Sequence, residues 1–153
     1  MIRLRDLPDF ATLWERRTTI ADEAGAEFNL LSIPDLVAAK KTQRTKDWPI
    51  IELLVAIHYR ESNTTPRADW INFWLLQART PELLQELIRR FPSQSRAQSE
   101  HRPLLHLTLS GEMDPLREAL DAETRAEQAK DRAYWAPLKA ELEALRRAER
   151  GEL

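Results

Sequence analysis

The amino-acid sequence predicts an α+β fold that is mostly α. We expect a short N-terminal β-hairpin, then a helical bundle, then a long C-terminal helix. Nine prolines against only three glycines indicate helices joined by abrupt corners. Apolar residues recur at helical spacing through the middle of the chain, and alanines mixed with charged residues fill its C-terminal part. These features predict one domain, 1–153, with a hairpin in 1–32, a helical core in 33–109 and a long kinked helix in 114–149.

The composition is that of a soluble globular protein. A chain of 153 residues can bury a core of its own, and 42% of its residues are hydrophobic and 31% charged. It contains no cysteine, and no apolar run approaches the ~20 residues that span a bilayer. We therefore expect a cytoplasmic protein that does not insert into membranes. A net charge of −2 argues against nonspecific coating of nucleic acid, because such binding needs many phosphate contacts.

The hairpin is expected to pair a strand over 16–20 with a strand over 27–31, around a turn at Glu23-Ala24-Gly25. Several helix starts are marked by a capping residue followed by proline, and Ser32 and Asp35 have the spacing of a capping box. The paired starts are Thr65-Pro66, Thr80-Pro81 and Asp114-Pro115. The expected helices cover 33–44, 49–60, 66–78, 80–91, 96–107 and 114–149.

Two of these helices have distinctive patterns. The helix over 49–60 is apolar on nearly every side, which predicts a central place in the core. The last helix is expected to be interrupted or kinked at Pro137. Beyond it, leucines follow at i, i+4 and i+7, and Glu143 and Arg147 have the spacing of a surface ion pair. Those leucines are Leu138, Leu142 and Leu145. Such an arm either folds back on the core or reaches a partner.

Three segments carry a resemblance to a known family: Leu13–Ile20, Phe28–Ile50 and Asp131–Leu142. They resemble small bacterial nucleotidyltransferase-like proteins, which are distant relatives of the minimal nucleotidyltransferases and of abortive-infection toxins with that fold. The resemblance implies that the hairpin is the remnant of a nucleotidyltransferase sheet, and that this chain corresponds to the C-terminal portion of such a protein.

The resemblance also implies which catalytic elements to look for. In such proteins a Gly-Ser turn and an Asp-x-Asp strand hold two Mg²⁺ ions and the triphosphate, because hard cations need carboxylate oxygens. This sequence has neither element, and Asn29 stands where the family tends to have a third acid. We therefore predict no catalytic or metal-ligating residue, and a non-catalytic protein that is either a truncated reading frame or a regulatory remnant. Mg²⁺ and a nucleoside triphosphate would be cofactors only if a missing N-terminal part exists.

The resemblance places Lys40, Arg44 and Asp47 near the phosphates of a bound nucleotide. Lys40 and Arg44 share one helical face, and Asp47 would orient a cation. A structural interpretation is favoured over this one: Lys40 or Arg44 pairs with Asp35 or Asp47 and fixes the helix corner. In the same way, Ser32 and Asp35 are interpreted as capping residues.

Other interpretations concern binding partners. A basic run with Trp48 beside it could bind RNA by stacking, although a solvated helix face is favoured. That run consists of Lys40, Lys41, Arg44 and Lys46. The three histidines lack the spacing of a zinc or ribonuclease site. An alternative function is a helical protein-interaction module, such as one half of a toxin–antitoxin-like pair, that binds through 114–149. A homodimer through that helix or through the hairpin edge is also possible.

Overall fold

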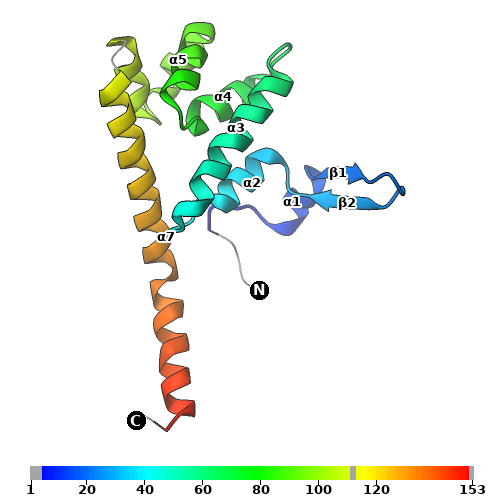
Figure 1. The fold of residues 1–153 in the computed structure, drawn as a ribbon, viewed down its shortest axis with the longest axis vertical. Helices are drawn as coiled ribbons and strands as arrows, with labels where there is room; N and C mark the ends of the chain where they lie inside the picture. The colour runs from blue at the N-terminus through cyan, green and yellow to red at the C-terminus, as the bar shows by residue number, and fades with distance from the viewer. Residues whose placement is uncertain (1–4, 111–112, 152–153) are drawn as a thin grey trace.

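A computed structural model describes residues 5–110 and 113–151 and shows the α+β, mostly helical fold that the sequence predicts. An antiparallel two-stranded hairpin projects to one side of a helical body, and a long helix runs down the other side (Figure 1). In chain order the middle of the body is built from α2 (Ile33–Lys40), the 3₁₀ turn η1 (Thr45–Asp47), α3 (Trp48–Ser62), α4 (Ala68–Gln77), α5 (Pro81–Arg90), α6 (Pro92–Gln98) and the 3₁₀ segment η2 (Pro103–Ser110).

The N-terminal part contains one helix that the sequence did not predict, α1 (Phe10–Glu15), whose first turn is capped by Asp9. The hairpin follows, with β1 (Thr18–Ala21) paired to β2 (Glu27–Leu30). Gly25 supplies the positive φ of +82° that the turn needs. Every residue of both strands is exposed, so neither strand contributes a buried side chain to the core.

Proline and capping signals predicted some helix starts and missed others. Thr80 caps α5 by accepting from Leu83 N, as expected. The Thr65 prediction is wrong, because α4 begins at Ala68 after Arg67, with no side-chain cap. Asp114 lies inside the first turn of α7 (Met113–Glu149) rather than before it. The helix predicted over 96–107 is also wrong: α6 ends at Gln98, and a separate 3₁₀ segment starts at Pro103, which has no backbone N–H to continue a helix.

The hydrophobic core lies between α3, α4, α5, η2 and the first turns of α7. Its fully buried large side chains are Val37, Ile51, Val55, Trp74, Leu75, Leu84, Leu87 and Leu116. The prediction for α3 is only half right, because Ile50 and Leu53 on its outer side are exposed. Helix α3 packs mainly on α2, η1 and α4, and Tyr59 at its C-terminal end donates to Glu86 of α5. None of the helices in the described ranges is long and apolar enough to cross a membrane.

Helix α7 divides into two halves with different surroundings. Its first half packs on η2 and α5 and buries Leu116 and Leu120. The helix then continues through Pro137 as one element, so the interruption predicted there is wrong, and a kink stays a prediction. Its second half projects beyond the body (Figure 1). Every residue from 136 to 151 is exposed. The predicted Glu143–Arg147 ion pair is confirmed at 3.3 Å.

Candidate functional site

The start of α2 is organised around Asp35. Ser32 is the N-cap residue: its Oγ accepts from Asp35 N at 3.3 Å, and its hydroxyl donates to Asp35 Oδ2. Arg16 donates to the other carboxylate oxygen. Asp35 is buried, so these contacts satisfy a carboxylate that would otherwise be costly to remove from water.

Asp47 fixes the corner between α2 and α3. Lys40 Nζ lies 3.7 Å from Asp47 Oδ1, and Thr42 Oγ1 donates to Asp47 Oδ2 at 2.6 Å. Both carboxylate oxygens are thus used inside the corner, and Arg44 is exposed beside it. This geometry supports the structural interpretation of Lys40 and Asp47. The role of Lys40, Arg44 and Asp47 in phosphate binding stays a prediction.

Trp48 does not offer the stacking surface that RNA binding would use. The indole is buried and its Nε1 donates to Thr42 O at 3.1 Å. The Arg79 guanidinium lies 5.2 Å from the ring centre and covers one face of the ring. This geometry does not favour base stacking on Trp48, and RNA binding by the basic run stays an untested alternative.

The histidines have separate surroundings. His58 Nδ1 accepts from Trp74 Nε1 at 2.9 Å, so this ring nitrogen carries no proton. Burial lowers the pKa of His58, which keeps the ring neutral among Trp70, Phe73 and Trp74. In the described ranges, no group of three or more His, Cys, Asp or Glu side chains is placed to hold a metal ion.

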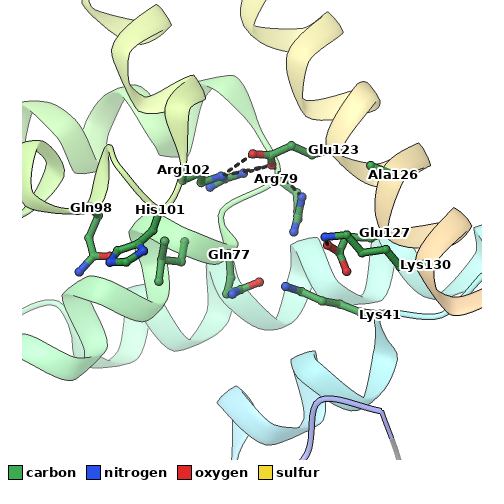
Figure 2. Close-up of a pocket in the computed structure, with 11 residues that line it drawn as sticks. Lys41, Gln77, Arg79, Gln98, His101, Arg102, Glu123, Ala126, Glu127 and Lys130 are labelled. Carbon is green, nitrogen blue, oxygen red and sulfur yellow. Dashed lines mark hydrogen bonds and ion pairs between the residues drawn. The ribbon is translucent and has the colours of Figure 1, made fainter. Parts of the chain in front are cut away.

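A groove that the sequence did not predict opens between α2, α4, α6 and α7. It has a volume of about 660 Å³, and its lining includes Lys41, Gln77, Arg79, Arg102 and Glu127. Lys41 is the residue of the basic run that enters it, because α2 ends at Lys40 and the chain turns there. In Figure 2 the side chains of Lys41, Gln77 and Arg79 converge on one space from different elements. Sequence spacing gives no sign of this, because α2 and α4 lie far apart in the chain.

Arg102 forms the buried wall of this groove. It donates to Leu75 O and to Ala78 O, each at 2.8 Å, and so satisfies carbonyls at the C-terminal end of α4. Its guanidinium also contacts Glu123 of α7, with Nη2 at 2.8 Å from Oε2, and Arg79 Nη1 lies 3.1 Å from the same oxygen. Arg102 therefore joins three elements of the body.

The second half of α7 presents an apolar stripe to solvent. The exposed fractions of Leu138, Leu142 and Leu145 are 39%, 44% and 56%. Asp131 links the middle of the helix to the body: its Oδ2 accepts from Gln43 N at 2.8 Å, and its Oδ1 accepts from Trp135 Nε1. One edge of the stripe carries a row of exposed cations at seven-residue intervals: Arg132, Lys139 and Arg146.

Comparison of the chain with protein-family models, with curated proteins and with solved structures finds no match in any of the three. The resemblance to nucleotidyltransferase-like proteins thus stays a prediction from sequence.

Proposed function

We propose that this chain is a non-catalytic, nucleotidyltransferase-like module that binds another protein through the second half of α7. The observation that carries the proposal is the stripe of three exposed leucines on a helix that projects beyond its own body. Large apolar side chains scattered singly on a surface are ordinary, but three at helical spacing on an unsupported helix form a continuous binding face.

The energetics of the arm favour a bound state. A segment of about a dozen residues is marginally helical in water unless its apolar face packs on something. Residues 138–149 have only the preceding turns of α7 to support them. Burying three leucines that are already part-covered would contribute about 1 kcal/mol each. A partner helix would therefore both bind and stabilise the arm.

The charges beside the stripe indicate what kind of helix fits. An antiparallel second copy would set Lys139 and Arg146 of one chain against the same cations of the other, which is unfavourable. A parallel copy meets a different obstacle. Leu138 lies about six turns after Leu116, which places both on one side of α7, and that side of the first half is filled by the body. The arrangement favours a different protein that offers an amphipathic helix with an acidic edge.

Substitution of Leu142 by Asp tests this proposal. We expect Leu142→Asp to lose the protein that the wild-type chain captures from extracts of its source cells, because a carboxylate on the stripe must be desolvated in the complex. Glu143→Gln is the matched control: Glu143 lies about 100° around the helix from Leu142, away from the leucine stripe, and the variant should retain capture. Circular dichroism should show both variants folded, since both positions are exposed. A wild-type chain that captures no protein, or a Leu142→Asp variant that captures the same protein as well as wild type, would contradict the proposal.

The non-catalytic part of the proposal has its own test. Purified protein incubated with Mg²⁺ and each labelled nucleoside triphosphate should transfer no label to RNA or protein, because the carboxylates that would hold two metal ions are missing from the sequence. The measurement is label retained on acceptor after gel separation. Transfer that disappears in Lys40→Ala would show instead that the chain is an enzyme.

A further inference from the structure

We infer that the groove between α2, α4, α6 and α7 is a binding site for the phosphate group of a small molecule, held by Lys41, Arg79 and Gln77. This inference is independent of partner binding by α7, because the groove lies beside the body and the leucine stripe lies beyond it. Three observations support it: an excess of positive charge, polar atoms without partners, and a space larger than the phosphate alone requires.

The first observation is the charge of the lining. The described residues around the groove include four cations and two carboxylates, although the whole chain carries a net charge of −2. The cations are Lys41, Arg79, Arg102 and Lys130, and the carboxylates are Glu123 and Glu127. Positive charge is therefore concentrated in the groove, although the net charge of the whole chain is negative.

The carboxylates are already engaged with other cations. Glu123 contacts Arg79 and Arg102, and Glu127 forms its ion pairs with Lys130 and Arg5. Lys41 is left with a charge that no ion pair within the described residues neutralises. Burial and the nearby Arg79 charge lower the pKa of Lys41 to about 8. Burial and Arg102 likewise lower the pKa of Arg79 to about 10. A bound anion would stabilise the charged forms of Lys41 and Arg79 and so raise both pKa values again.

The second observation concerns polar atoms. Arg79 Nε and Gln77 Oε1 are buried and have no hydrogen-bond partner in the described part of the chain. The Arg79 side chain is only 8% exposed. Nearly all buried polar groups in proteins are hydrogen-bonded, so unpaired ones beside a groove indicate a missing partner. Of the two, Arg79 Nε is a donor that an anion could satisfy, whereas Gln77 Oε1 is an acceptor. Gln77 donates to an anion only with its amide turned about the last bond, which puts Nε2 in the place of Oε1.

The third observation is the size and donor set of the site. The Lys41 ammonium and the Arg79 guanidinium point toward one space beside the Gln77 amide (Figure 2). With that amide turned so that Nε2 takes the place of Oε1, three kinds of N–H donor would suit the three terminal oxygens of a phosphate monoester. Its charge of about −1.5 to −2 at neutral pH matches the excess of two cations. The groove volume of about 660 Å³ lies within the range of whole small-molecule sites. The remaining space, toward Gln98 and His101, would hold the organic part of the ligand.

Isothermal titration calorimetry at low ionic strength and pH 7 tests the site. We expect inorganic phosphate and sulfate to bind, and Lys41→Met to weaken both at least tenfold. Lys46→Met is the control: it removes an exposed cation from the same corner, outside the groove, and should change affinity less than twofold. Adenosine monophosphate should bind and adenosine should not. Tighter binding of the monophosphate than of inorganic phosphate assigns the site to a monoester, and equal affinity assigns it to free phosphate.

The pH dependence of sulfate binding separates the site from general charge attraction. Sulfate does not change charge between pH 7 and 9, whereas Lys41 with a pKa of about 8 loses most of its charge. The charged and titratable groups around Lys41 in the groove are Arg79, Arg102, His101, Glu123, Glu127 and Lys130. Among them the pKa of Arg79, at about 10, lies above this range, and that of Glu127 is lowered and lies far below it. Affinity should fall about tenfold from pH 7 to 9 in the wild type and stay flat in Lys41→Met. Three results would each overturn the inference. One is that Lys41→Met binds anions as tightly as wild type, and another is that Lys46→Met loses as much anion affinity as Lys41→Met. The third is that adenosine binds as tightly as its monophosphate.

Discussion

Replacing Arg102 with leucine should lower the free energy of unfolding by about 3–5 kcal/mol, the usual effect of breaking a buried ionic contact by removing one partner. The Arg102 side chain is 4% exposed. Its loss would leave Leu75 O and Ala78 O without these donors at the end of α4 and would remove one of two cations from Glu123. Unpaired buried carbonyls and a poorly compensated carboxylate each destabilise the folded state.

Urea denaturation followed by circular dichroism measures this effect. Arg102→Lys should recover only part of the loss, because an ammonium cannot donate to two carbonyls and a carboxylate with the geometry of a guanidinium. Arg117→Met is the control: it removes an arginine whose ion pair with Asp114 is exposed, and it should change stability by about 0.5 kcal/mol or less. A loss of less than about 1 kcal/mol for Arg102→Leu would show that Arg102 is not a structural link.

The overall fold was predictable from sequence because its main signals are local. The Ser32 capping box marked the start of α2, Thr80-Pro81 marked that of α5, and the charge spacing in the last helix gave the Glu143–Arg147 pair. Helix α1 was missed because it is only six residues long and buries none of them, so no apolar periodicity marks it. The helix predicted over 96–107 was wrong because the two halves of this segment belong to different elements, on either side of Arg102.

The groove could not be predicted from sequence in the same way. The partners of Arg102 are 21 to 27 residues away in the chain, so no local pattern marks it as a link between elements. The sequence pattern groups Lys41 with the basic run. Its side chain points in a different direction from those of its neighbours because α2 ends at Lys40. Long-range contacts of this kind depend on how helices pack, which periodicity does not encode.

The division of α7 into a half that packs in the core and a half that is exposed gives the second large effect. Leu116 is fully buried, so Leu116→Ala should lower the free energy of unfolding by about 2–5 kcal/mol through lost apolar burial and the cavity that remains. Leu145 is 56% exposed on the same helix, and Leu145→Ala should change stability by about 0.5 kcal/mol or less.

Truncation locates the boundary between the two halves. Deleting residues 114–153 would remove Leu116, Leu120 and Glu123, so it should unfold the body and cannot test partner binding alone. A chain ending at Ala136 keeps the Trp135–Asp131 contact and should retain wild-type stability in urea within about 1 kcal/mol. It should nevertheless lose the captured partner. If Leu145→Ala or this truncation destabilised the body as strongly as Leu116→Ala, the arm would fold back on the body, and its leucines would be unavailable to another helix.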